Sequence, residues 1–125
     1  MNEKETIEEL TVLSYNALGI KRSKSRKTRN AQARAAIGVS MYGFFTQDGI
    51  ARSLYIDRST ISHYSKKHSE NMVFWTGYRD IYATVSELVI EQCRSANIQQ
   101  EIDSLDKSIE NLIRRKHNLK ARLTA

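Results

Sequence analysis

The sequence predicts an all-α protein, in which a helix-turn-helix domain is followed by a long C-terminal coiled-coil-like helix. Three observations support this prediction. The 125 residues contain no proline and only five glycines, apolar residues recur at helical spacing, and a heptad pattern begins at Ile98. Because proline interrupts a helix interior, its absence favours long helices. We expect an N-terminal amphipathic helix in residues 1–20, the helix-turn-helix domain in 21–92 and a helical oligomerisation segment in 93–125.

The first element is a short amphipathic helix over residues 3–18. Ile7, Leu10 and Leu18 share one face, and the glutamates of the first turns lie outside it, near the positive end of the helix dipole. Gly19 ends this helix. Residues 21–29 then hold six basic side chains and no acid, namely Lys21, Arg22, Lys24, Arg26, Lys27 and Arg29.

A second helix is expected from about Thr28 to near Thr46, and Arg34 continues the basic face along it. Two short helices joined by a tight turn come next, with Thr46 as the candidate cap of the first and Asp57 as that of the second. A helix-turn-helix needs apolar residues where its helices cross. Here these are Ile50, Leu54, Ile56, Ile61 and Tyr64, with Ala51 at the most crowded point.

Tyr55 occupies the position in the turn where glycine commonly supplies a positive φ. A non-glycine residue is disfavoured in that conformation. A turn of a different form is therefore an open alternative.

The start of the second short helix, within about Asp57 to Lys67, presents polar side chains that suit the edges of DNA bases. These candidate base-reading residues are Arg58, Ser59, Thr60, Ser62 and His63. Lysines and arginines beside such a helix would neutralise phosphates and release counterions. The candidate phosphate-binding residues are Lys21, Arg22, Lys24, Arg26, Lys27, Arg29, Arg34, Arg52, Lys66 and Lys67.

The segment DRSTISHYSKKH resembles the Asp-His-Thr-Thr-Val signature in the C-terminal DNA-binding domain of the bacterial replication initiator DnaA. Asp57 matches the family Asp, Arg58 its His, Ser59 and Thr60 its two threonines, Ile61 its Val, and His63 and Lys67 the later His and Lys. Ile50-Ala51 resembles the Ile-Gly pair upstream. The resemblance covers about residues 22–90 and implies a Trp-repressor-like helix-turn-helix whose basic loop, here Arg26 and Lys27 with Arg34, holds the DNA backbone and minor groove.

The chain departs from that family in two respects. Arg58 replaces the family His, and the turn before Asp57 is one residue shorter, so the initiator's recognition sequence is not carried over. The chain also lacks a Gly-x-x-x-x-Gly-Lys-Ser/Thr loop, so the ATPase of a full initiator is not expected.

Beyond Glu70, an apolar run predicts a buried segment and then another helix that starts near Gly77. Phe74 and Trp75 are expected in the core rather than as a platform on which bases stack.

The C-terminal heptad predicts self-association, because an isolated helix would leave its apolar seam in water. The seam is Ile98, Ile102, Leu105, Ile109, Leu112, Lys116, Leu119 and Leu123. A parallel dimer would place Glu101 against Asp106 and Lys116 against its own copy. An antiparallel homodimer, which we favour, pairs Glu101 with Arg122 and fills every core layer. The alternatives are a higher homo-oligomer and folding of the basic C-terminal half onto the acidic first helix of the same chain.

Bulk composition narrows the class of function. A net charge of +6 and a pI near 9.6 favour a polyanionic partner. Cys93 is the only cysteine, as expected of a reducing cytoplasm, and no stretch is apolar enough to span a membrane. We therefore expect a soluble cytoplasmic protein that binds double-stranded DNA and is not an enzyme, with no metal, cofactor, membrane or small-molecule substrate. The alternative functions are a DNA-packaging adaptor resembling a phage small terminase subunit, and a structural or RNA-binding helical oligomer.

Overall fold

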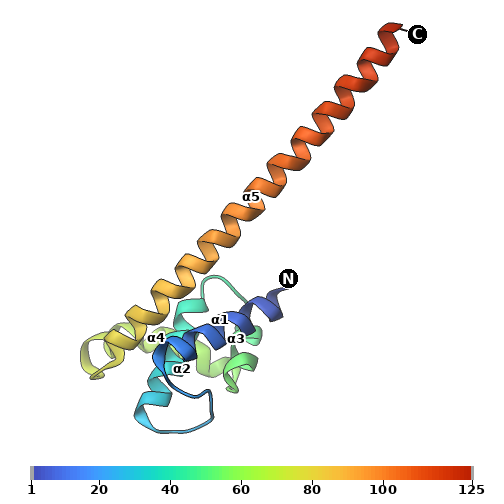
Figure 1. The fold of residues 1–125 in the computed structure, drawn as a ribbon. Coiled ribbons are helices and arrows are strands. Elements are labelled where there is room, and N and C mark those ends of the chain that lie inside the picture. Colours follow the sequence, from blue (N-terminus) through green and yellow to red (C-terminus); the bar gives the residue numbers. More distant parts are fainter. Residues whose placement is uncertain (1, 125) are drawn as a thin grey trace. The chain divides into compact units, whose positions relative to one another are not determined.

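The computed structural model describes residues 2–124, and these residues form five α-helices and no strands (Figure 1). The all-α prediction is confirmed, and so is the long C-terminal helix. The helices are α1 Glu3–Leu18, α2 Thr28–Met41, α3 Gln47–Leu54, α4 Arg58–Phe74 and α5 Tyr78–Thr124. The chain divides into two compact units, Met1–Gln92 and Cys93–Ala125. No helix within residues 2–124 has the length and apolar character needed to cross a membrane.

Both ends of α1 are closed by specific caps, of which the sequence predicted the one at Gly19. The Asn2 side chain accepts a hydrogen bond from the Glu5 amide, and Gly19 adopts the left-handed conformation at φ 66° that ends the helix. Ile7, Leu10 and other residues of its inner face are buried. The first helix is therefore part of the N-terminal unit, where it packs against α2 and α3.

Small side chains make up part of the buried surface of α2, which packs against α1, α3 and α4. Ala33, Ala35 and Ala36 are fully buried, and a Cβ at Gly38 would lie 3.2 Å from the Cδ1 atom of Ile61 on α4. The missing side chain at Gly38 lets α2 approach α4 closely at this point.

The second helix is shorter than the sequence suggested. It ends at Met41, five residues before Thr46, and residues 42–45 form a turn in which Phe44 and Phe45 donate their amides to the Met41 carbonyl. Gly43 within the turn weakens helix propensity. Phe44, which the predicted helix needed on its apolar face, is 50% exposed, so little burial opposes the end of the helix.

The two short helices predicted around residue 55 are α3 and α4, and they pack together as a helix-turn-helix. The Thr46 hydroxyl accepts the Gly49 amide at the start of α3. Asp57 precedes α4 as predicted, but its side chain makes no capping hydrogen bond. Ile50, Leu54 and Ile61 are fully buried and Ala51 nearly so, whereas Ile56 and Tyr64 are half-buried.

Tyr55 takes the left-handed conformation that a glycine would favour. Its φ is 59° and its ψ 40°, and it is the single non-glycine residue with positive φ among those described. Its amide hydrogen-bonds towards the carbonyls of Ala51 and Arg52, which closes α3. The turn therefore keeps its usual form at a cost of about 1–2 kcal/mol for a residue with a Cβ.

The prediction that Phe74 lies in the core is wrong. Phe74 is 82% exposed and Val73 67%, while Trp75 is half-buried and stacks on Tyr78 with 5.6 Å between ring centroids. At about 100° per residue, the face of α4 that buries Ile61 returns near Met72. Val73 and Phe74 consequently point away from the core.

The turn between α4 and α5 ends at Gly77, whose φ is 89°. The Gln32 side chain holds this turn by donating to the Thr76 carbonyl at 2.8 Å. Tyr78, Val85 and Val89 then bury one face of the first turns of α5. The N-terminal unit thus ends with a helix anchored by its own apolar face.

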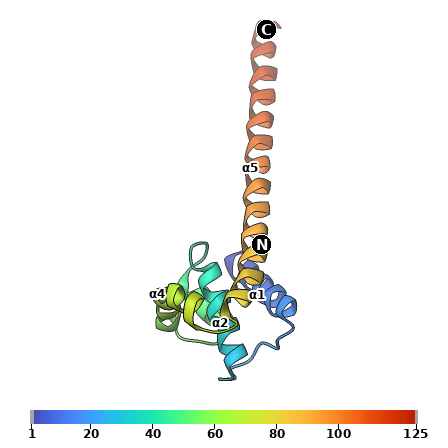
Figure 2. The ribbon, with the colours of Figure 1, turned by 90° about the vertical axis from the view of Figure 1, so that its left-hand side faces the viewer.

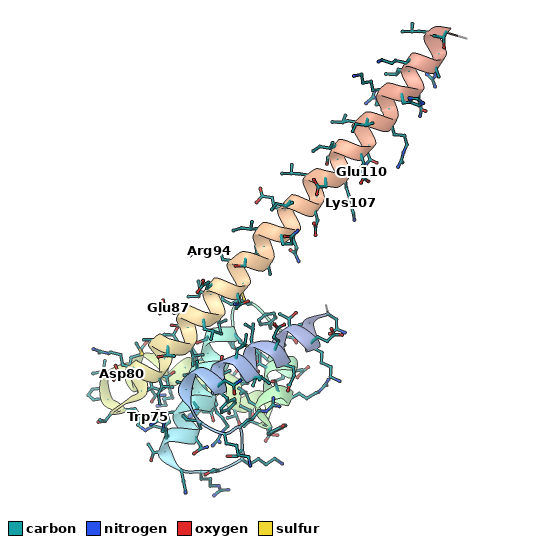
Figure 3. All side chains as sticks on the ribbon, viewed as in Figure 1. Trp75, Asp80, Glu87, Arg94, Lys107 and Glu110 are labelled. Carbon is teal, nitrogen blue, oxygen red and sulfur yellow. The ribbon has the colours of Figure 1, made fainter. Side chains whose placement is uncertain are left out.

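The second unit is the remainder of α5. Its residues from Arg94 to Thr124 are all exposed, and the apolar seam residues range from 46% exposed at Ile102 to 86% at Leu123. Figure 3 shows side chains standing out along this part of the helix, with Arg94, Lys107 and Glu110 labelled. The seam predicted from the heptad therefore presents an unpartnered apolar stripe.

Candidate nucleic-acid interface

The first turns of α4 present polar and basic side chains around a shallow, open hollow of about 710 Å³. Arg58, Ser59, Ser62, His63 and Lys66 line it from α4, because positions three and four residues apart share a helix face. The structure therefore brings together four of the five candidate base-reading residues. The fifth, Thr60, is half-buried and does not line this hollow.

Gln47 completes the hollow from α3 and was missed from the sequence. Its amide nitrogen donates to the Tyr42 hydroxyl at 3.1 Å. The available signal was its position directly after the Thr46 cap, at the start of the helix that braces α4. An amide at this position suits a phosphate oxygen, because protein–DNA backbone contacts include such neutral donors.

The cations near the hollow are weakly paired. The Arg58 Nε atom lies 3.8 Å from the Asp48 Oδ1 atom, and both side chains are 67% exposed. Lys67 is 3.4 Å from Glu70 and is also exposed. Exposed pairs at such distances contribute little, so both cations remain available to an anionic ligand.

The basic segment forms a hydrogen-bonded loop between α1 and α2 (Figure 2). The hydroxyl of Ser23 accepts the Ser25 amide, and the hydroxyl of Ser25 accepts the Lys27 amide, each at 3.2 Å. The Asn30 side chain also donates to the Ser23 hydroxyl, at 3.3 Å. The cations that this loop exposes are Lys21, Lys24, Arg26, Lys27 and, at the start of α2, Arg29, whose guanidinium also donates to the Leu18 carbonyl at 3.0 Å.

Two predicted phosphate ligands are instead used inside the domain. Arg34 is only 7% exposed and donates to the Ser23 carbonyl at 3.1 Å. Arg22 is mostly buried and makes a two-pronged ion pair with Glu8, at 2.9 and 2.6 Å. Because their guanidinium groups are already engaged, we assign both arginines to support of the loop rather than to phosphate contact.

Arg52 also lies apart from the hollow on α4. It borders a separate depression between α1 and α3, beside Glu3 and Glu8. A phosphate there would meet acidic side chains, so the predicted role of Arg52 has less support than that of Lys66.

The Arg22–Glu8 contact stabilises the charged form of both side chains. The hydrogen bonds from Arg22 hold the pKa of the Glu8 carboxyl below its ordinary value, and the same contact raises the pKa of Arg22. The pair is therefore ionised near neutral pH, and its charges largely cancel where the basic loop begins.

Within residues 2–124, no three His, Cys, Asp or Glu side chains come together as a metal site would require.

Comparison of the chain with protein-family models, with curated proteins and with solved structures finds no match. The resemblance to the initiator domain therefore rests only on the sequence motifs around Asp57, at Ile50-Ala51 and in the basic loop.

Proposed function

We propose that the protein binds double-stranded DNA in a sequence-specific manner through α4 and the basic loop. The observation that carries this proposal is the convergence of Arg58, Ser59, Ser62 and His63 on one open, polar face at the start of α4. Helix-turn-helix proteins read base edges in the major groove with this part of the second helix. Arginine, serine and histidine side chains supply the hydrogen-bonding groups that such readout needs.

Backbone contacts are assigned to the exposed cations of the loop together with Lys66, Lys67 and Gln47. This division of roles agrees with the motif that resembles the DnaA domain, and with the net charge of +6. The cytoplasmic location expected from the single cysteine is part of the same proposal.

We further propose that the exposed stripe of α5 pairs with a second copy of the chain. In the antiparallel register, Ile98 faces Leu123, Ile102 faces Leu119 and Ile109 faces Leu112, so six apolar seam residues of each chain are covered. Leu105 faces Lys116, whose alkyl stem can cover it while the ammonium group reaches water. Two readers joined in this way would engage two half-sites.

The primary test is selection of binding sites from random duplex DNA at two salt concentrations. Base readout predicts an enriched motif. With about five phosphates contacted, log affinity should fall against log salt with a slope near −4 to −5. A slope near zero, with no enriched motif, would refute the proposed function.

A pair of serine substitutions tests whether α4 reads bases. Ser59→Ala should reduce discrimination against mismatched sites by about 1–3 kcal/mol, or about 5- to 150-fold. The matched control is Ser69→Ala, the same change on an exposed position of the same helix that does not line the hollow. Equal discrimination by the two variants and the parent protein would argue against base readout by Ser59.

The second candidate is a DNA-packaging adaptor, and the observation that favours it is the length and exposed stripe of α5. Such an adaptor also joins a helix-turn-helix to a helical oligomerisation segment. A ring-sized mass with salt-sensitive binding but no enriched motif would support it over the dimer. Equal affinity for an RNA duplex and unchanged binding by Ser59→Ala would instead support the RNA-binding alternative.

A further inference from the structure

The Arg22–Glu8 ion pair links three parts of the N-terminal unit that are distant in the sequence. Glu8 belongs to α1, Arg22 to the basic loop, and Ser53 to the last turn of α3. The Arg22 Nη1 atom lies 3.4 Å from the Ser53 carbonyl oxygen. The Ser53 hydroxyl lies 3.4 Å from a Glu8 oxygen and donates to the Thr11 hydroxyl at 2.7 Å. One small polar network therefore ties the loop to α1 and α3.

Arg22 also reaches the strained turn of the helix-turn-helix. Its guanidinium carbon lies 5.2 Å from the centroid of the Tyr55 ring, within the range of a cation–π contact. Tyr55 lies directly between α3 and α4 and is the one non-glycine residue within 2–124 that has a positive φ. A tyrosine at this position costs backbone energy, but it supplies a ring on which the arginine rests.

The rest of the basic loop is built on the residues next to Arg22. Two side chains of α2 bind Ser23: the Arg34 guanidinium donates to its carbonyl, and the Asn30 amide donates to its hydroxyl. The exposed cations that follow are therefore carried by a segment fixed at both ends. A ligand that bound them would not have to order the loop, so less of its binding energy would be lost.

We propose that Glu8 and Arg22 are positioning residues for DNA binding: their ion pair, resting on Tyr55, holds the basic loop and α4 in one binding-competent geometry. This inference rests on the proposed function. It gives the acidic side chain of Glu8 a supporting role in the binding of DNA, although a carboxylate by itself repels a polyanion.

The sign of one substitution separates the two ideas. Glu8→Gln removes a negative charge and frees Arg22 to contact a phosphate, so electrostatics alone predicts tighter DNA binding. Positioning predicts the opposite. If the loop is competent in only about a tenth to a third of molecules without the pair, apparent affinity falls by about three- to tenfold.

The matched control is Glu9→Gln, which makes the same charge change one residue along α1. Glu9 is exposed and has no ion-pair partner among residues 2–124. This variant should bind DNA as the parent does, or tighter by less than about twofold. Arg22→Lys is the second test variant, because it keeps the charge but loses the two-pronged geometry and the planar stacking. It should weaken binding in the same direction as Glu8→Gln and decides the question if Glu8→Gln does not fold.

Binding is measured on a short duplex at fixed salt, alongside hydrogen exchange of the Ser25 and Lys27 amides in the free protein. Weaker binding and faster exchange in Glu8→Gln and Arg22→Lys, with neither change in Glu9→Gln, support positioning. Binding by Glu8→Gln as tight as the parent, with unchanged exchange, overturns the inference while the proposed function stands. A parent protein with no salt-sensitive affinity for the duplex overturns both.

Discussion

Reversing the charge of Glu101 should weaken an antiparallel α5 dimer and strengthen a parallel one. Glu101 flanks the seam beside Ile102 and is exposed, as is Arg122. In the antiparallel register these two residues meet across the dimer. In the parallel register Glu101 meets Asp106, and the two carboxylates repel each other. The same Glu101→Arg substitution therefore has opposite effects in the two arrangements.

The exposure of both side chains sets the size of the effect. An exposed ion pair on helices contributes about 0.3–0.5 kcal/mol, and a like-charged pair costs a similar amount. Turning attraction into repulsion thus changes each pair by about 1 kcal/mol. A two-fold dimer contains two such pairs, so the total is about 2 kcal/mol, or about 30-fold in the dissociation constant.

Sedimentation equilibrium at low salt measures this constant. Arg122→Glu combined with Glu101→Arg should restore the antiparallel dimer, because the pair is then reversed but intact. Glu110→Arg is the control, since the heptad places Glu110 directly after the seam residue Ile109, at a position that should not face the partner helix. Tighter association of Glu101→Arg would refute the antiparallel register. A parent protein that is monomeric at micromolar concentration, with or without residues 98–125, would refute the dimer itself.

Three further predictions concern the N-terminal unit. Ile61→Ala removes a fully buried side chain beside Gly38 and should lower the free energy of unfolding by about 2–5 kcal/mol, as measured by urea denaturation. Tyr55→Gly should change it by less than about 1 kcal/mol, because relief of about 1–2 kcal/mol of backbone strain is offset by the greater chain entropy of glycine and the lost arginine contact. Burial lowers the pKa of His68 in the folded protein, so as pH falls the unfolded chain is protonated at this residue before the folded chain is. The free energy of unfolding therefore has its full value above the ordinary pKa of 6.5 and decreases as pH falls from there through the lower pKa of the folded protein. His68→Gln should flatten this loss in denaturation curves recorded between about pH 7 and pH 5.

Two of these predictions have a control variant, and the third has an outcome that would contradict it. Ile90→Ala, at a residue that is 45% exposed, should cost less than Ile61→Ala; equal costs would contradict the packing of α4 on α2. A gain of 2 kcal/mol or more from Tyr55→Gly would show that Arg22 contributes nothing to the turn. His117→Gln on the exposed part of α5 should leave the pH dependence of the parent unchanged. If it flattened the curve as much as His68→Gln, the assignment to His68 would fail.

Local signals in the sequence located most helix boundaries. Thr46 and Asp57 stand directly before α3 and α4, and Gly19 directly follows α1. The heptad likewise located the exposed seam of α5. These features depend on residues within a few positions of one another, so they can be interpreted without knowledge of the fold. The end of α2 was predicted poorly, because whether Phe44 joins the core depends on packing beyond that helix.

The candidate site was predicted only in part, because some of its residues share one helix and others are brought there by packing. Spacing along one helix placed Ser59, Ser62 and His63 on a common face, and the structure shows that face to be open. Gln47 belongs to another helix, so its arrival at the same hollow required the packing of α3 against α4. Thr60 falls on the flank of the helix, where burial by neighbouring elements decides its exposure.

By itself, the sequence determined that the chain is helical, about where its five described helices begin, and which side chains start α4. Only the tertiary structure decided which cations remain free. Arg22 and Arg34 look in the sequence like the other members of the basic run, but Glu8 and the Ser23 carbonyl engage them. A charge is available to a ligand only if no partner already holds it, and partners that lie 11 or 14 residues away are chosen by the packing of helices rather than by local sequence.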